Sequence, residues 1–133
     1  MSEAREVGML VVYSLTHAGK ASDINHQLSP SLIDPIVKSN VDKFYKTDLE
    51  SILQKNNIQT VIVTGYSANG AVLHTATAAA FRGYYVEVPV DGISAANPYA
   101  EQYTAWHMLN SPGTRNRAVL TNTAFITLVP SLC

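Results

Sequence analysis

Two stretches of this sequence carry groups that could act on a small molecule. The first is Lys38, which ends the short apolar run Ile36–Lys38. An ammonium group at the end of a buried strand could stabilise an anion or could have a lowered pKa. The alternative is an ordinary solvated lysine on the surface. The spacing alone leaves both interpretations open.

The second stretch is the turn GYSANGA at residues 65–71, which lies between a strand pattern and a helical pattern. Its backbone N–H groups, at the start of the helix, could bind an anion or an oxyanion. The turn contains no His, Cys, Asp, Glu or Lys. Ser67 is only a loose candidate for a nucleophile, because it lies in no Gly-x-Ser-x-Gly sequence and no His–Asp pair is evident to activate it. A plain connecting turn is the alternative.

The histidines and the cysteine argue against metal and disulfide sites. The four histidines show no metal-ligand spacing; they are His17, His26, His74 and His107. Cys133 is the single cysteine, which excludes a disulfide framework and a cysteine-based zinc site in this chain. We therefore expect no metal and no cofactor, and we favour structural roles for His74 and His107.

Composition limits the class of protein. The 133 residues fit one domain, residues 1–133, and an apolar content of 47% can bury a real core. A net charge of -1 does not suit a polyanion-binding surface, so we expect no nucleic-acid partner. No apolar run approaches the roughly 18 to 20 residues of a membrane helix, and the charged start Met1–Glu6 does not resemble a secretory signal. A cytoplasmic setting is the expectation.

Apolar runs rich in β-branched residues predict the strands that position these groups. Val7–Leu15 is almost continuously apolar, as in a strand buried on both faces of a parallel sheet. The other predicted strands are Ile36–Lys38, Thr60–Thr64, Tyr84–Val90 and Ala118–Thr121. Residues 16–35 read as a loop with one helical turn from Ser22, and residues 125–128 as a short terminal element.

Capping signals predict the helices. Thr47 and Glu50 have the spacing of a capping box, which opens a helix ending near Lys55. A second helix runs from about Asn69 to Arg82 and stops at Gly83. A third helix, from Pro98 to Leu109, follows a capping Asn97. The third helix also carries aromatic side chains at intervals close to one helical turn; they are Tyr99, Tyr103, Trp106 and His107. Such a set is more typical of a core or of a subunit contact than of a cage around a ligand.

Strands that alternate with helices at this spacing indicate an α/β protein with a parallel sheet and right-handed crossovers. Ligands of such sheets bind beyond the carboxyl ends of the strands. This rule groups four segments around one rim: residues 14–18, Lys38, residues 66–71 and residues 91–94. No repeat and no second domain is evident.

The segment GYSANGAVLHTATAAAFRGYYVEVPVDG, residues 65–92, resembles the signature of the isochorismatase-like (cysteine hydrolase) family. The segment Ile36–Leu49 is similar to the family's run of a catalytic Lys, a Phe and a Thr-capped helix. The resemblance extends from about Ala4 to Leu128. It implies a three-layer, Rossmann-like parallel sheet flanked by helices, and commonly an oligomer.

The family uses an Asp–Lys–Cys triad, and the resemblance assigns its roles by position. Lys38 corresponds to the triad lysine, and Ala71 stands where the family has the nucleophilic Cys. The backbone N–H groups of Ser67 and Ala71 would form the oxyanion hole, with Tyr66–Ser67 as the candidate cis peptide bond. The substrate-binding positions would be Tyr66, Asn69 and Gly70.

Two departures limit what this chain's own residues can do. Ala71 has no nucleophile, which excludes thioester chemistry there; true isochorismatases also lack the Cys and use acid catalysis by the Asp. The family's Asp lies on a strand ahead of the segment that matches Val7–Leu15, and Met1–Glu6 matches the helix after that strand. The resemblance therefore implies a chain shortened at its N-terminus. No other carboxylate clearly replaces the Asp; those considered are Asp23, Asp34 and Asp91.

Three hypotheses follow. The first is a shortened, cysteine-less isochorismatase-like hydrolase that binds a small anionic or carbonyl-bearing molecule at the rim of Lys38 and Ser67–Ala71. The second is a non-catalytic relative that binds small molecules or forms oligomers. The third is a complete short sheet on which another residue performs new chemistry. For each we expect a homo-oligomer without membrane contacts, and the aromatic segment Pro98–His107 has no assigned role.

Overall fold

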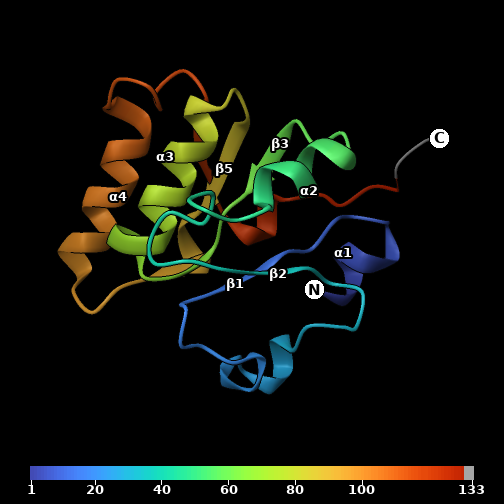
Figure 1. The fold of residues 1–133 in the computed structure, drawn as a ribbon. Coiled ribbons are helices and arrows are strands. Elements are labelled where there is room, and N and C mark those ends of the chain that lie inside the picture. The colour runs from blue at the N-terminus through green and yellow to red at the C-terminus, as the bar shows by residue number, and fades with distance from the viewer. Residues whose placement is uncertain (131–133) are drawn as a thin grey trace.

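A computed structural model describes residues 1–130 of the chain, so Cys133 lies outside the described part. Short parallel strands form the centre, and helices pack against them (Figure 1). This arrangement confirms the predicted α/β class. None of the helices within residues 1–130 is long and apolar enough to cross a membrane.

The strands form three separate parallel groups. β1 (Tyr13–Leu15) pairs with β2 (Ile36–Lys38). The largest group has the order β3 (Thr60–Ile62), β5 (Tyr85–Pro89) and β7 (Ala118–Thr121). A short pair joins β4 (Gly65–Tyr66) to β6 (Ile93–Ser94). The non-sequential pairing of β3, β5 and β7 requires crossovers, which the helices supply.

The predicted strand Val7–Leu15 is wrong over most of its length. The helix α1 (Ser2–Glu6) ends at Val7, Gly8 has a φ of 78°, and only Tyr13–Leu15 forms a strand. A β-ladder needs a hydrogen-bonded partner, and in residues 1–130 β1 pairs with β2 only, while β3 pairs with β5 only. The β1–β2 pair therefore has no ladder to the β3–β5–β7 sheet.

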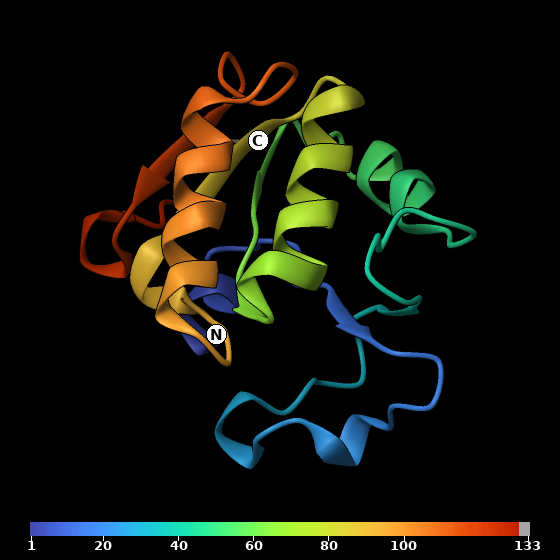
Figure 2. The same cartoon turned by 90° about the vertical axis from the view of Figure 1, so that its left-hand side faces the viewer.

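Two long helices lie side by side against the β3–β5–β7 sheet (Figure 2). α3 (Leu73–Phe81) follows a π-helical turn, Ala68–Val72, so the predicted helix from Asn69 begins with a wider turn. Ala76 and Ala79 are fully buried, and their small side chains let α3 approach the sheet closely. Gly83 has a φ of 92°, the left-handed conformation predicted for the residue that ends this helix.

α4 (Pro98–Asn110) begins as predicted, because the side chain of Asn97 accepts a hydrogen bond from the Tyr99 N–H. α2 (Leu49–Lys55) differs, because the predicted capping box does not form. The Thr47 hydroxyl accepts from the Leu49 N–H, but Glu50 forms an ion pair with Arg82 of the neighbouring helix at 3.2 Å. A tertiary partner has replaced the local one.

The remaining loop predictions were partly right. Residues 16–35 contain two 3₁₀ turns, Ala21–Asp23 and His26–Leu28, where one helical turn was predicted. The short terminal element is a 3₁₀ turn at Thr123–Phe125, earlier than the predicted residues 125–128.

The core contains apolar side chains from the β1–β2 pair and the loop after it, and from the β3–β5–β7 sheet and its helices. Its members include Val37, Phe44, Leu53, Val72, Val86, Val88 and Met108. The ring of Phe44 stacks on that of Tyr84, with centroids 6.3 Å apart, which packs the segment after β2 against the segment before β5.

We predict that Met108→Ala lowers the free energy of unfolding by about 2–5 kcal/mol, because it leaves a cavity at a fully buried site. Met9→Ala is the matched control, since Met9 is 39% exposed, and its effect is expected to stay below about 1 kcal/mol. Urea unfolding followed by circular dichroism measures both. Equal losses would contradict this description of the core.

Candidate functional site

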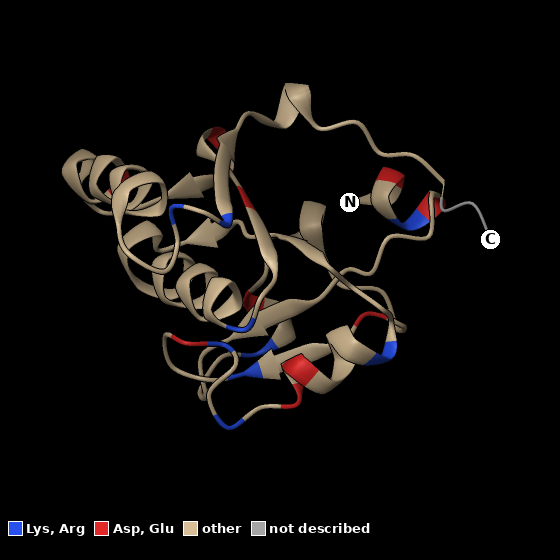
Figure 3. Ribbon diagram, turned by 90° about the horizontal axis from the view of Figure 1, so that it is seen from above, with Lys and Arg blue, Asp and Glu red and all other residues tan. Residues whose placement is uncertain are grey.

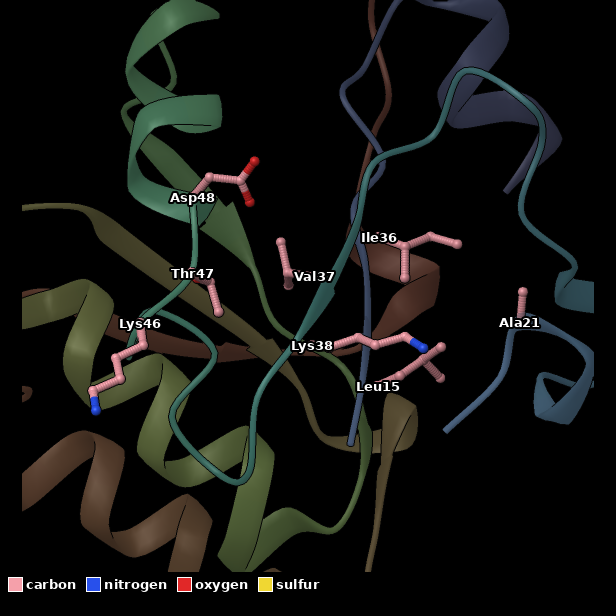
Figure 4. A pocket seen from close by; sticks show the side chains of 8 residues that line it. All are labelled: Leu15, Ala21, Ile36, Val37, Lys38, Lys46, Thr47 and Asp48. Atoms are coloured by element: carbon pink, nitrogen blue, oxygen red, sulfur yellow. The ribbon is translucent and has the colours of Figure 1, made fainter. Parts of the chain in front are cut away.

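Lys38 is the last residue of β2, and its side chain is exposed. It lines an open pocket of about 650 Å³. In Figure 4 the Lys38 side chain extends toward Leu15 and Ala21, whereas Thr47 and Asp48 line the pocket on the other side of Val37. Asp48 was missed as a pocket residue, because its sequence position indicated only a role at the start of a helix.

The turn at residues 65–71 is tightly folded. The peptide bond between Tyr66 and Ser67 is cis, and it is the bond that the resemblance singled out. The Ser67 carbonyl accepts hydrogen bonds from the Gly70 N–H at 3.0 Å and the Val72 N–H at 3.2 Å. The N–H groups of Ser67 and Ala71, the two assigned to an oxyanion hole, are not among the donors of these bonds.

The side chains of the turn differ in exposure. Tyr66 and Asn69 are exposed, and Ala71 is half-buried. Gly70 permits a close approach, because a Cβ there would lie 2.6 Å from the Ser67 hydroxyl oxygen. The turn therefore offers backbone donors and an exposed ring around a methyl group, with no ionisable side chain except the Tyr66 phenol.

Loop 39–47 lies between Lys38 and this turn. Val41 Cγ1 is 3.9 Å from the position that a Gly70 Cβ would take, so the loop lies beside the turn. None of the residues that line the Lys38 pocket belongs to the turn. Lys38, Thr47 and Asp48 therefore line one pocket from opposite sides of Val37, and loop 39–47 runs from Lys38 to a position beside the turn.

The three carboxylates considered as substitutes for the family's Asp are used in local structure. Asp34 accepts two bonds from Arg5 Nε and Nη2, at 3.1 and 2.5 Å to Oδ2, and one from the Ser31 N–H at 2.7 Å. Asp23 accepts from the Lys20 N–H at 2.8 Å. Asp91 accepts from the N–H and the hydroxyl of Thr123, which fixes the last 3₁₀ turn.

Their electrostatics agree with these roles. The hydrogen bond from the Arg5 guanidinium is the main cause that holds the pKa of Asp34 below its ordinary value. The bonds from Thr123 lower the pKa of Asp91 in the same way. A general acid needs a raised pKa near neutral pH, and these two carboxyl groups are shifted in the opposite direction.

The histidines inside the helices have structural partners, as the sequence favoured. His74 Nδ1 lies 2.8 Å from the Gly70 carbonyl oxygen, and His107 Nδ1 lies 3.0 Å from the Ser111 hydroxyl oxygen. No group of three His, Cys, Asp or Glu residues within residues 1–130 could hold a metal ion.

The aromatic residues of α4 face outward in this chain. Tyr99, Tyr103 and Trp106 are 71, 40 and 59% exposed, so a core role within the single chain is excluded. Tyr103 stacks on Trp106, with ring centroids 6.4 Å apart. A subunit contact remains the other interpretation.

Lys43 is a second lysine that sequence reasoning missed. It is 5% exposed, and its ammonium group donates to the backbone carbonyls of Leu15, Ser39 and Asn40. Burial lowers its pKa, because desolvation disfavours the charged form. No sequence signal marks it, since the residue lies between Asp42 and Phe44 in an otherwise ordinary loop.

Known proteins resemble this chain in sequence and in fold. A family model, the isochorismatase domain, matches residues 1–124. The chain belongs to the isochorismatase family. Among curated relatives, an N-carbamoylsarcosine amidase from an Arthrobacter species is 30% identical over 93 residues, which cover 69% of this chain and 35% of the amidase. The uncharacterized isochorismatase family protein YaaI of Bacillus subtilis (strain 168) is 28% identical over 92 residues. These residues cover 68% of this chain and 51% of YaaI.

The matched part of this isochorismatase-family chain thus spans about a third of the length of the Arthrobacter amidase and about half of the length of YaaI. Solved structures share the fold. The nicotinamidase PncA from Bacillus subtilis aligns with a TM-score of 0.77 at 19% identity, covering 90% of this chain and 79% of that one. An N-carbamoylsarcosine amidase from Thermoplasma acidophilum aligns with a TM-score of 0.76 at 24% identity, covering 94% and 79%. These alignments confirm the predicted isochorismatase-like fold.

We predict that Asp34→Asn destabilises the isochorismatase-family domain at neutral pH, because it breaks the charged bonds to Arg5. A carboxyl group whose folded-state pKa is lowered stabilises the fold above its ordinary pKa of 3.8. That contribution is lost as the pH falls through the lowered value. The difference between wild type and variant should therefore shrink below about pH 4.

Urea unfolding at a series of pH values measures this difference. Glu6→Gln is the control, since Glu6 is exposed and should leave the stability nearly unchanged at each pH. A difference between wild type and Asp34→Asn that does not depend on pH would contradict the role assigned to the ion pair.

Proposed function

We propose that this isochorismatase-family hydrolase domain binds a small anionic or carbonyl-bearing molecule between Lys38 and the turn Ser67–Ala71. The observation that carries the proposal is the turn itself. Among the backbone hydrogen bonds outside helices and strands in residues 1–130, neither the Ser67 nor the Ala71 N–H is a donor, whereas the Ser67 carbonyl accepts from the Gly70 and Val72 N–H groups. Donors at a strand-to-helix turn suit a carbonyl oxygen on which negative charge develops.

The substitution of Ala71 for the family's nucleophile limits the chemistry. No covalent intermediate can form on the methyl group of Ala71, so at that position the turn can only bind and polarise the ligand. Lys38 supplies a positive charge that balances negative charge on the ligand. Asp48 is the carboxylate that shares the pocket of Lys38. Hydrolysis by acid catalysis needs a carboxyl group with a raised pKa, and the hydrogen bonds that lower the pKa of Asp34 and Asp91 argue against those two.

The alternative is a non-catalytic relative that binds the same class of molecule. Ala71 and the structural use of the carboxylates favour it. Ammonia release separates the two functions, with N-carbamoylsarcosine and nicotinamide as probes, because similar proteins are named as amidases of these compounds. An amidase of these compounds releases ammonia above the rate of the buffer alone, whereas a binding module shows saturable binding without release.

We predict that Lys38→Ala weakens the binding of N-carbamoylsarcosine, which carries both a carboxylate and a carbonyl group, by about tenfold, since it removes a charged hydrogen-bond donor. Isothermal titration calorimetry measures the Kd. Lys55→Ala is the control, because Lys55 is exposed in the last turn of α2, and its Kd should equal that of wild type. An unchanged Kd in Lys38→Ala would remove Lys38 from the site.

We also propose that residues 1–133 act as one domain in the cytoplasm and as a homo-oligomer. The exposed aromatic residues of α4 support self-association. In the view of Figure 3, Lys and Arg lie among Asp and Glu, which supports a small-molecule ligand over a nucleic acid.

Trp106→Ser is expected to shift the oligomer toward the monomer, because it removes the largest exposed ring of α4. Size-exclusion chromatography with light scattering measures the mass. Lys55→Ala again serves as the control. A mass that is the same in wild type and Trp106→Ser would exclude this ring from the contact.

A further inference from the structure

Among residues 1–130, the ammonium group of Lys43 is buried without a carboxylate partner. Its three donors go to backbone carbonyls, at 3.1 Å to Leu15, 2.9 Å to Ser39 and 2.7 Å to Asn40. The ion pairs within residues 1–130 join other side chains, Arg5 with Asp34 and Arg82 with Glu50. A buried charge is costly unless hydrogen bonds satisfy it, so each of these three bonds is needed to hold the lysine in place.

The three carbonyls lie at the carboxyl ends of two strands. Leu15 is the last residue of β1, and Ser39 and Asn40 directly follow Lys38 at the end of β2. The Ser39 N–H also donates to the Leu15 carbonyl at 3.1 Å. Lys43 therefore fixes the position at which the backbone leaves Lys38.

The backbone of Lys43 is held by α3 instead. Its N–H donates to the hydroxyl of Thr75 at 3.1 Å, and the same hydroxyl donates to the Val41 carbonyl at 3.1 Å. Thr75 is buried and lies one helical turn after Ala71. Val41 Cγ1 lies 3.9 Å from the position that a Gly70 Cβ would take. Lys43 thus attaches the loop to β1 and β2 through its side chain and to the start of α3 through its backbone.

This double attachment matters because the β1–β2 pair shares no ladder with the β3–β5–β7 sheet in the described residues. Lys38 lies on the first part, and the turn Ser67–Ala71 leads into α3 on the second. We propose that Lys43 is a positioning residue that sets Lys38 relative to this turn. The functional consequence rests on the proposed ligand site, whereas the structural link can be tested without any ligand.

The first test is amide hydrogen exchange, followed by NMR on the intact domain. In Lys43→Met, the protection of the backbone amides at positions 39 and 43 should fall about tenfold or more relative to wild type. The amides of Val63 and Val86, which bond within the β3–β5–β7 sheet, should keep theirs. Lys55→Met is the matched control and should change none of the four. An equal fall at all four amides, or no fall at positions 39 and 43, would overturn the proposal.

The second test uses Thr75, and it also serves if Lys43→Met does not fold. Thr75→Val removes the hydroxyl that joins the loop to α3, and Thr75→Ser keeps it. The Kd of N-carbamoylsarcosine should rise about tenfold in Thr75→Val and return to within about twofold of wild type in Thr75→Ser. Equal affinities in both variants would overturn the proposal. If wild type binds no probe, the proposed function fails, and the exchange experiment still decides the role of Lys43.

Discussion

The hydrogen bonds of Lys43 and Thr75 connect two parts of the molecule that no β-ladder joins within residues 1–130. β1 and β2 form one parallel pair, and β3, β5 and β7 form another sheet. The polar contacts act together with apolar packing, since Phe44 of the same loop stacks on Tyr84 and its ring lies 4.4 Å from the Arg82 guanidinium carbon. The relative position of Lys38 and the turn at 65–71 depends on this loop.

The candidate site gains its character from backbone groups more than from side chains. A turn of small residues places N–H donors at the start of α3, and Gly70 lets the chain pass close to Ser67. Ala71 provides a methyl group where the family resemblance places a nucleophile. The function proposed for this site is to bind and polarise a carbonyl or an anion. Turnover would also need an acid, and Asp34 and Asp91 are engaged in hydrogen bonds to Arg5 and Thr123.

Local signals in the sequence predicted the elements whose determinants are local. The runs Ile36–Lys38 and Ala118–Thr121 are strands as predicted, because their apolar and β-branched residues fit a packed sheet. Gly83 and Asn97 mark helix boundaries through their own backbone and side-chain chemistry. The strand prediction failed at residues 7–12, since a strand also requires a neighbour to pair with.

Tertiary partners decided the features that the sequence could not predict. Glu50 pairs with Arg82 instead of capping its own helix, and Asp34 pairs with Arg5 from a distant segment. Lys43 is buried because three carbonyls from two strand ends surround it, which no spacing rule anticipates. Asp48 lines the pocket of Lys38 because loop 39–47 returns the chain to it.

The most direct test of the proposed ligand site between Lys38 and the turn Ser67–Ala71 is an NMR titration of ¹⁵N-labelled protein with N-carbamoylsarcosine. We predict saturable shifts of the Ser67 and Ala71 amides together with residues next to Lys38. Shifts confined to other surfaces, with these amides unmoved at saturation, would contradict the site.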